Sequence, residues 1–287
     1  MIIDSHAHYS HFKFNDRFRY LSVENGDYRI NEGSRDDILA ELTQVGISGV
    51  IEPAIDFASN QKIFEFCKAH PGFIFPAVGI HPTRTASVKW RDLFRLREYA
   101  SEQTVIAIGE TGLDYHYPRK EQHRLRQMLM FQYQIDLAVK RKLPLILHVR
   151  QAYKDVIRIL KWNRKNLNGG VAHCFCGTKE DALELIQLGF CIGVGGVLLQ
   201  TNEKAANLQA VVRTIPMEKI LIETDSPYVL PDIVNLQLGS KAQRKIRNTS
   251  LLLPKVIQKI AELKEMNAAE VEKNVYKNTV TVFNLLG

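Results

Sequence analysis

The chain has 287 residues and a formal charge of +7; 45% of its residues are hydrophobic and 24% are charged. This composition is typical of a folded globular protein and excludes low-complexity and collagen-like chains. The length suits one α/β barrel of about 250 residues, so we expect a single domain over residues 1–287. The chain shows no apolar run near the roughly 20 residues of a membrane span and starts without a signal-peptide pattern, so we expect a cytoplasmic protein with no membrane contact. The positive charge favours polyanionic partners, although many basic enzymes bind none.

Short apolar runs alternate with segments of helical periodicity along the whole chain. We expect strands at 2–8, 47–55, 73–81, 105–110, 145–149, 170–174, 190–195 and 220–224. Between them we expect helices near 35–45, 57–69, 89–101, 119–142, 151–165, 179–188 and 203–213, followed by two more at 250–264 and 268–284. This alternation indicates parallel β-α units, and eight of them predict a closed (β/α)8 TIM barrel of the α/β class. An open doubly wound sheet is the alternative, but its usual glycine-rich loop G-x-G-x-x-G does not follow the first strand.

The connection over residues 9–33 is longer than usual in such a barrel and mixes aromatic, polar and basic side chains. Connections of this length are usually functional or mobile, so we expect a loop that could cover the mouth of the barrel. Two capping boxes, Ser34 with Asp37 and Thr178 with Asp181, mark the starts of helices.

Four cysteines are scattered along the chain in a pattern that does not suggest disulfides. Cys174-Phe175-Cys176 directly follows His173 and could belong to a zinc site. No second closely spaced pair of cysteines completes such a site, so we expect Cys174 and Cys176 to be small core residues.

Ionisable side chains stand where the apolar runs end. The first run ends in His6 and His8, which on one strand would share a face roughly 6–7 Å apart. Neutral imidazoles so placed can bind one cation of the Zn, Mn, Fe or Co type, although a lone H-x-H is more often a surface pair or a buried histidine. The fourth, fifth, sixth and eighth runs end in Glu110, in His148, in His173 and in Glu223-Thr224-Asp225.

In a barrel these strand ends converge on one face. Burying several ionisable groups without partners would cost several kcal/mol each, so they must share protons, hydrogen bonds or metal. Any one of them alone could be a hydrogen-bonded core residue. Four histidines and two carboxylates together make a plausible site for two cations.

Longer motifs around these residues carry a resemblance to a known family. In chain order they are Asp4-Ser5-His6-Ala7-His8, Gly79-Ile80-His81-Pro82, Ile108-Gly109-Glu110-Thr111-Gly112-Leu113-Asp114-Tyr115, Leu147-His148-Val149-Arg150, His173-Cys174-Phe175-x-Gly177, Glu223-Thr224-Asp225-Ser226-Pro227-Tyr228 and Asn278-Thr279-x-x-x-Phe283. By these motifs the chain resembles the TatD family of metal-dependent hydrolases, in the amidohydrolase superfamily, over nearly its whole length. The resemblance implies a TIM barrel with divalent metals at its mouth and hydrolysis as the reaction.

The resemblance also implies a role for each strand-end residue. His6, His8 and Asp225 would hold one ion, His148 and His173 would hold the second, and Glu110 would bridge the two. Both carboxylates are candidate catalytic groups. Asp225 would accept the proton of the attacking water, and Glu110 is the weaker candidate base because bridging commits its lone pairs. The implied cofactors are two divalent ions, Zn, Mn or Mg.

The sequence departs from the family pattern in two regions where we expect contact with the substrate. Family members commonly carry an Arg-Gly-x-x-Asn-x-Pro-like stretch after the last strand, of which this chain keeps Arg247-Asn248 and lacks the proline. The 9–33 connection also exceeds that of the family. The resemblance to the family therefore predicts the metal chemistry more securely than it predicts the substrate.

Candidate substrate contacts surround the predicted ligands. Arg150 shares a strand face with His148 and could bind phosphate bidentately. His81 could hydrogen-bond a phosphoryl oxygen or cap its own loop, and Glu223 could orient a ligand from behind. Tyr115 and Arg247 complete the predicted substrate-binding set. Basic side chains gather at Arg119, Lys120, His123, Arg124, Arg150, Lys154, Lys241, Arg244, Lys245 and Arg247, and aromatic ones that could stack on bases are Tyr115, Tyr117, Phe175 and Tyr228.

The leading hypothesis is a deoxyribonuclease that cleaves phosphodiester bonds in single strands or at 3′ ends, using a metal-activated water. The alternatives on the same site are a small-molecule ester, amide, lactone or phosphoester hydrolase and an aminoacyl-tRNA deacylase. A non-catalytic binding protein on a retained barrel is a different class, which the complete ligand set disfavours. No obligate protein partner is evident from the sequence.

Overall fold

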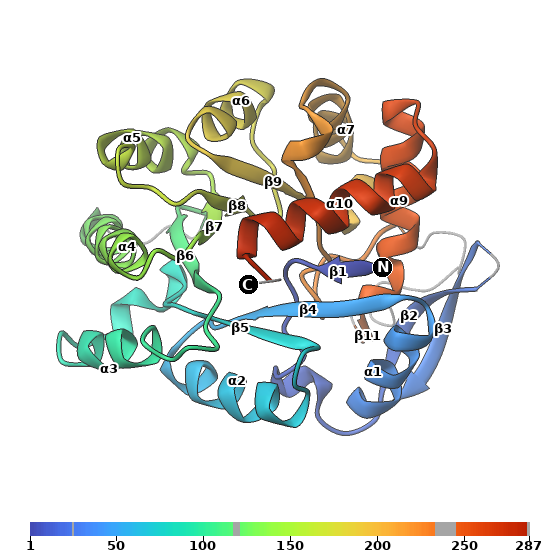
Figure 1. Cartoon of the computed structure of the whole chain (residues 1–287), viewed down its shortest axis with the longest axis horizontal. Helices are drawn as coiled ribbons and strands as arrows, with labels where there is room; N and C mark the ends of the chain where they lie inside the picture. The colour runs from blue at the N-terminus through green and yellow to red at the C-terminus, as the bar shows by residue number, and fades with distance from the viewer. Residues whose placement is uncertain (25, 117–120, 233–244, 286–287) are drawn as a thin grey trace.

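Eight parallel strands form one continuous sheet, and helices surround it (Figure 1). The computed structural model describes residues 1–24, 26–116, 121–232 and 245–285. In sheet order the strands are β1 (Ile2–Asp4), β4 (Ile47–Pro53), β5 (Ile74–Val78), β6 (Ala107–Asp114), β7 (Leu145–Arg150), β8 (Gly170–Ala172), β9 (Phe190–Val194) and β10 (Ile220–Ile222). The order follows the chain, as successive right-handed β-α units require. The predicted TIM barrel is confirmed, and the open doubly wound sheet is excluded.

The predicted helices occur within a few residues of their expected positions. They are α1 (Arg35–Gln44), α2 (Phe57–Ala69), α3 (Asp92–Tyr99), α4 (Glu121–Arg141), α5 (Tyr153–Asn163), α6 (Lys179–Gln187), α7 (Glu203–Thr214), α9 (Leu253–Lys264) and α10 (Ala268–Phe283). Short 3-10 turns are η1 (Phe12–Phe14), η2 (Pro82–Ser87), η3 (Gly196–Leu199), η4 (Met217–Lys219) and η6 (Ser250–Leu252). Both predicted capping boxes are present, at the starts of α1 and α6.

Each of the eight strands contributes one residue to a buried cluster inside the barrel. These residues are Ile3, Ile51, Ala77, Ala107, Ile146, Val171, Cys191 and Leu221. Phe283 of α10 joins the same cluster, and α10 lies across the face of the barrel that is turned to the viewer in Figure 1. The helix therefore closes the end where the strands begin. The opposite end, where the strands stop, is called the mouth below.

A network of buried hydrogen bonds closes the barrel between its first and last strands. Ser5 N donates to Ile222 O at 3.0 Å, and Asp225 N donates to His6 O at 2.9 Å. The carboxylate of Asp4, fully buried, accepts the hydroxyls of Thr224 and Ser250, each at 2.6 Å. Burial raises the pKa of Asp4 to about 6, although these hydrogen bonds oppose the shift. The network fixes the segments that carry His6 and Asp225 relative to each other.

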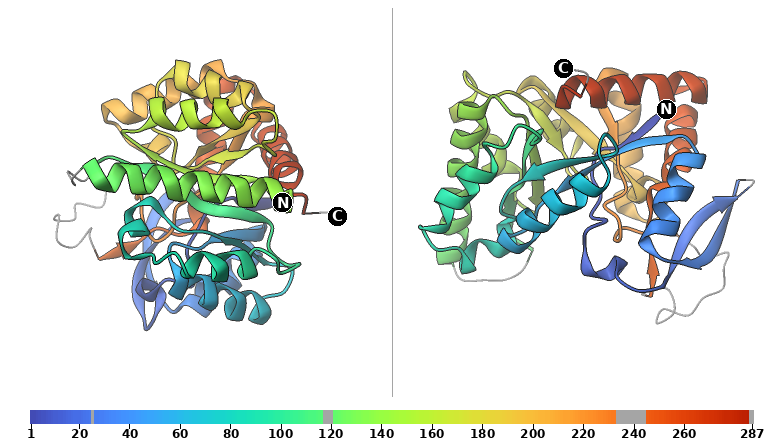
Figure 2. Two further views of the ribbon diagram at one scale, coloured as in Figure 1. Left: turned by 90° about the vertical axis from the view of Figure 1, so that its left-hand side faces the viewer. Right: turned by 60° about the horizontal axis from the view of Figure 1, so that its bottom comes forward.

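The expectation of a loop over residues 9–33 is wrong for its second half. Residues Phe18–Glu24 (β2) and Asp27–Gly33 (β3) form an antiparallel hairpin, and Ile246–Arg247 (β11) pairs with β2 in parallel. The hairpin lies beside α1, at the end of the molecule away from α10 (right view of Figure 2). Tyr20 Oη donates to Glu41 Oε2 at 2.9 Å, which ties the hairpin to α1.

Two further expectations need correction. The first strand stops at Asp4, so His6 and His8 follow the strand instead of ending it. Cys176 is exposed and Cys174 is half-buried, so they are not core residues. In the part of the chain that the structure describes, neither cysteine belongs to a group with metal-ligand geometry, and no helix has the length and apolar character to cross a membrane.

Candidate metal centre

His6 and His8 converge even though they do not share a strand. Their Nε2 atoms lie 3.1 Å apart, and the two rings stand at 84° to each other. His8 Nδ1 is 3.1 Å from the carbonyl oxygen of Pro53, which can only accept. A neutral His8 therefore carries its proton on Nδ1 and turns the lone pair of Nε2 toward His6.

Two carboxylates complete this first group of ligand atoms. Asp225 Oδ1 lies 3.6 Å from His6 Nε2 and 3.5 Å from His8 Nε2. Glu110 Oε2 lies 3.7 Å from His6 Nε2 and 3.9 Å from His8 Nε2. The ligand atoms of His6, His8 and Asp225 all lie within 4.8 Å of one another, and this donor set, with Glu110 beside the two histidines, suits a borderline divalent cation.

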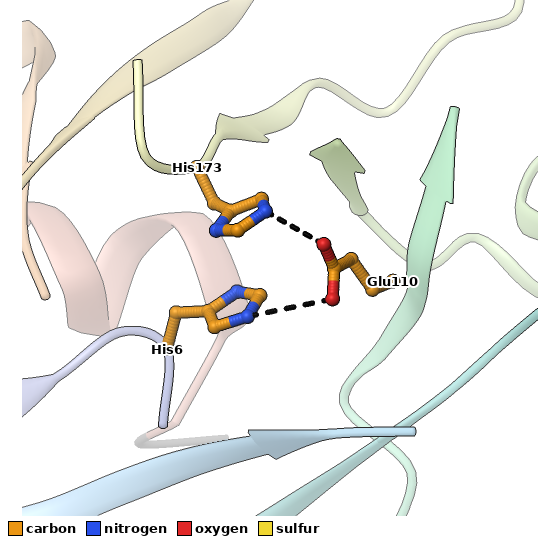
Figure 3. A group of neighbouring side chains, drawn as sticks. All are labelled: His6, Glu110 and His173. Carbon is orange, nitrogen blue, oxygen red and sulfur yellow. Dashed lines mark ion pairs between the residues drawn. The ribbon is translucent and has the colours of Figure 1, made fainter. Parts of the chain in front are cut away.

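The other oxygen of Glu110 faces a second group of histidines. Glu110 Oε1 lies 2.7 Å from both His148 Nδ1 and His173 Nε2, which are 3.3 Å from each other. Figure 3 shows Glu110 between His173 and His6, with one carboxylate oxygen directed at each ring. Glu110 is the carboxylate that contacts both groups, which is the position expected of a bridging ligand.

All six predicted ligands therefore meet at the mouth; their roles as ligands stay predictions. Among the described residues, three sets have ligand atoms within 4.8 Å of one another: His6, Glu110 and His173; His6, His8 and Asp225; and His81, Glu110 and His148. The sequence did not predict His81 in such a set. The donors fit divalent cations, because histidine nitrogens and carboxylates are the usual ligands of Zn and Mn.

The ionisable groups of the centre strongly shift one another's pKa values. Burial opposes protonation of His8 and His148, but the carboxylates beside them outweigh burial and raise each pKa to about 9. Burial and the neighbouring His173 lower the pKa of His6. Burial would raise the pKa of Glu110, but the surrounding histidines hold it well below its ordinary value. The centre therefore places ionised carboxylates among the histidines, and a cation that bound there would displace protons from the histidine rings.

Asp114 is a functional candidate that the sequence analysis did not assign. Its Oδ2 lies 3.1 Å from His148 Nε2, while His148 Nδ1 faces Glu110. A carboxylate behind a histidine ligand fixes the tautomer and orientation of the ring. The sequence could have pointed to Asp114, because it stands four residues after Glu110 inside the motif of residues 108–115.

Glu223 and Glu52 are buried carboxylates behind the centre. Glu223 Oε1 accepts a hydrogen bond from Cys174 N and lies 3.9 Å from His173 Nδ1, which is compatible with the orienting role predicted for it. Burial raises its pKa well above the ordinary value. Glu52 accepts hydrogen bonds from Tyr9 N and Ser10 N, each at 2.8 Å, and so fixes the turn after His8.

A cavity of about 680 Å³ opens from the centre to solvent. Arg150, His81 and Tyr228 line it, together with most of the predicted ligands. Tyr115 and Arg247 do not line it: Tyr115 Oη donates to Asp155 Oδ2 at 3.0 Å, and Arg247 lies on β11 beside the hairpin. Phe175 is buried in the core and cannot stack on a base. Of the other candidates, Arg119, Lys120, Tyr117, Lys241 and Arg244 lie outside the described residues.

His81 caps its own loop and also presents a ring nitrogen at the cavity wall, whereas its contact with substrate stays a prediction. Its Nδ1 accepts a hydrogen bond from Thr83 N at 3.2 Å and caps the turn η2. Since Nδ1 is the acceptor, a neutral His81 carries its proton on Nε2, which lies 3.3 Å from Glu110 Oε1 at the cavity wall. Burial lowers the pKa of His81 and favours this neutral form.

Comparison with known proteins gives the same family as the motifs. The family model of TatD related DNases matches residues 3–284. The metal-dependent hydrolase YabD of Bacillus subtilis (strain 168) is 31% identical over 285 residues, covering 99% of this chain and 100% of that protein. The 3′-5′ ssDNA/RNA exonuclease TatD of Erwinia tasmaniensis is 29% identical over 251 residues, covering 88% of this chain and 94% of that protein.

Solved structures of TatD proteins have the same fold. The TatD homologue YJJV from Escherichia coli K12 aligns with a TM-score of 0.80 and 26% identity, over 99% of this chain and 98% of that one. A TatD family hydrolase from Entamoeba histolytica aligns with a TM-score of 0.79 and 25% identity, over 98% and 97% of the two chains. With a matching family model, a whole-length relative and a shared barrel, the chain belongs to the TatD-related DNase family of metal-dependent hydrolases.

Proposed function

We propose that the protein is a nuclease that removes nucleotides from the 3′ ends of single-stranded DNA or RNA with two divalent ions, Zn, Mn or Mg. The position of Glu110 carries the proposal, because its two oxygens face different histidines: Oε2 faces His6 and His8, and Oε1 faces His148 and His173. Two bound divalent cations supply a water of lowered pKa and stabilise negative charge on phosphate oxygens.

The side chains of the mouth have distinct parts in the proposed reaction. Asp225 reaches the cavity from the side of His6 and His8, and we propose that its carboxylate accepts the proton of the attacking water. The Nε2–H of His81 donates to a phosphate oxygen or to the leaving oxygen. Arg150 lines the same cavity and neutralises phosphate charge.

Three observations support a nucleic acid as the substrate class. Relatives that cover most of this chain are named 3′-5′ ssDNA/RNA exonucleases. The net charge of +7 favours a polyanion. The centre lies at the bottom of a cavity at one end of a barrel, which a strand end enters more easily than an unbent duplex does. A small-molecule ester or an aminoacyl-tRNA would use the same centre.

We further propose that residues 1–287 work as one cytoplasmic domain. The family model spans residues 3–284 without interruption, which supports a single unit. All four cysteines are free, which suits a reducing compartment.

The proposal is tested with purified protein supplied with Mg²⁺, Mn²⁺ or Zn²⁺ in turn. We expect 5′-labelled single-stranded DNA and RNA to shorten from their 3′ ends, and we expect His6→Ala to abolish the shortening. His70→Ala, which removes a histidine at the end of α2, is the matched control and should leave activity intact. No cleavage of either nucleic acid with any of the three metals would refute the proposed substrate and leave the family assignment untouched.

A further inference from the structure

A side groove opens into the main cavity next to His8. It has a volume of about 160 Å³ and lies between the turn η1 and the first turn of α2. His8, Ile55 and Arg84 line both the groove and the main cavity, so the two spaces adjoin at these residues. A chain whose end lies at the metal centre can therefore extend into the groove.

Aromatic rings lead from the main cavity into this groove. Tyr228 lines the main cavity, and its hydroxyl lies 3.2 Å from His11 Nε2. The rings of His11 and Tyr228 are 5.7 Å apart, and those of His11 and Phe12 are 4.3 Å apart. Phe12 ends the row in the groove wall with 67% of its surface exposed. The rings are inclined to each other, by 69° between His11 and Tyr228 and by 34° between His11 and Phe12, so they offer separate faces. Exposed aromatic faces are the usual stacking platforms for unpaired bases.

The turn that presents Phe12 is anchored on both sides. Glu52 holds the backbone of Tyr9 and Ser10, just before the turn. Phe14, just after Phe12, is buried, and its ring lies 4.9 Å from that of Tyr9. An anchored turn keeps Phe12 in solvent, where a large apolar ring gains nothing for folding. Exposure alone does not distinguish Phe12 from Phe94; what distinguishes Phe12 is its place in the wall of a groove beside the metal centre.

The charges around the groove favour a polyanion. Lys62 and Arg84 line it, and Lys13 Nζ lies 3.9 Å from the centre of the Tyr228 ring. The acidic residue in the groove wall is Asp56, whose Oδ2 is 4.0 Å from Arg84 Nε. Two cations against one carboxylate leave the groove itself positive, and phosphates spaced along a strand can contact them.

We propose that this groove is a nucleotide subsite for single-stranded nucleic acid, with a base stacked on Phe12 and backbone phosphates beside Arg84 and Lys62. The inference rests on the proposed nuclease function and adds where the strand lies on the 5′ side of the scissile bond. Stacking accepts any base, so the subsite discriminates by strand length and single-strandedness and not by sequence.

The test compares Phe12→Ala with Phe94→Ala, because Phe94 has a similar exposure of 69% and lies on α3. Binding of fluorescent, cleavage-resistant phosphorothioate oligothymidylates and oligouridylates of 2 to about 10 nucleotides is measured by anisotropy. We expect Phe12→Ala to weaken binding of the long oligonucleotides by about 5- to 100-fold and of the dinucleotides much less. Phe94→Ala should change neither, and Phe12→Trp should restore length dependence.

A second measurement separates this subsite from the centre. Hydrolysis of bis(p-nitrophenyl) phosphate, which has no further nucleotide to place on Phe12, should proceed at the same rate in Phe12→Ala and in the unsubstituted protein. Equal losses on short and long oligonucleotides, or no loss on either, would overturn the subsite while leaving the nuclease function standing. Absence of oligonucleotide binding and cleavage by the unsubstituted protein would overturn both.

Discussion

Asp114 Oδ2 lies 3.1 Å from Nε2 of His148, on the ring nitrogen opposite the one that faces Glu110. This pair determines which nitrogen of His148 is available to a cation. When Nε2–H donates to the carboxylate, Nδ1 is left with a lone pair directed into the centre. Asp114 is thus a positioning residue in the proposed site.

We expect Asp114→Ala to weaken binding of divalent metal by about 10- to 100-fold, because the ring of His148 loses its fixed tautomer and orientation. Competition with a chromogenic chelator measures the affinity. Asp92→Ala, at the start of α3, removes a carboxylate far from the centre and should have no effect. Equal metal affinity of the Asp114 variant and the unsubstituted protein would contradict the assigned role.

The number of ions can be tested with His148→Ala. This variant lacks a ligand of the second ion but keeps His6, His8 and Asp225, whose ligand atoms form a complete set. We expect elemental analysis to find about two ions per chain in the unsubstituted protein and about one in the variant. Loss of all metal, or retention of both ions, would show that the two groups do not bind separately.

Gly112 faces His148 across the β6–β7 pair, and a Cβ there would lie 2.1 Å from the carbonyl oxygen of His148. Gly46→Ala is the matched control, because Gly46 also has a positive φ and has nothing within 4 Å of the added carbon. Backbone strain alone should lower the free energy of unfolding by about 1–2 kcal/mol in Gly46→Ala. We expect a clearly larger loss in Gly112→Ala, measured by urea unfolding, together with weaker metal binding. Similar losses in both variants would contradict the predicted clash.

The hydrogen bond from Tyr20 to Glu41 makes the stability of the fold depend on pH in the alkaline range. Burial and the bond to Glu41 raise the pKa of Tyr20 to about 12, above the ordinary value of 10. The neutral hydroxyl therefore stabilises the fold fully below pH 10, and this contribution disappears as the pH rises through about 12. We expect the unsubstituted protein to be more stable than Tyr20→Phe at pH 8 and to lose that advantage between pH 10 and 12, by thermal unfolding. A pH-independent difference would contradict this linkage.

The barrel was predictable because each of its strands is an apolar run bounded by a helix, and a parallel sheet buries both strand faces. The hairpin was missed although its signals were present. Aromatic and basic side chains alternate in Phe18-Arg19-Tyr20, and Asn25-Gly26 is a typical hairpin turn sequence. The aromatic and basic composition of the segment suggested a substrate loop and obscured the alternation.

The meeting of the six predicted ligands was predictable from topology, because parallel strands of a barrel end on one face. The expected strand ends were only approximate, because Glu110 and His148 lie inside β6 and β7 and the predicted end of the fourth strand at Glu110 is wrong. The contact partner of each ligand atom, however, was not predictable from topology. His148 uses one ring nitrogen toward Glu110 and the other toward Asp114, which depends on side-chain torsions that no spacing rule contains. Tyr115 was expected at the substrate, but it does not line the cavity, and its hydroxyl donates to Asp155, which lies 40 positions further along the chain.

The closure between β1 and β10 makes the metal centre dependent on the order of synthesis. His6 and His8 come before seven of the eight barrel strands in the chain, whereas Asp225 and the Ser250 hydroxyl that anchors Asp4 come after all eight. During synthesis, His6 and His8 therefore lack the carboxylate of Asp225, which completes their group, until the last barrel strand has been made. We therefore expect this pair to gain its full set of candidate ligands only once the barrel has closed, and a chain that lacks β10 and the residues after it to keep an incomplete set.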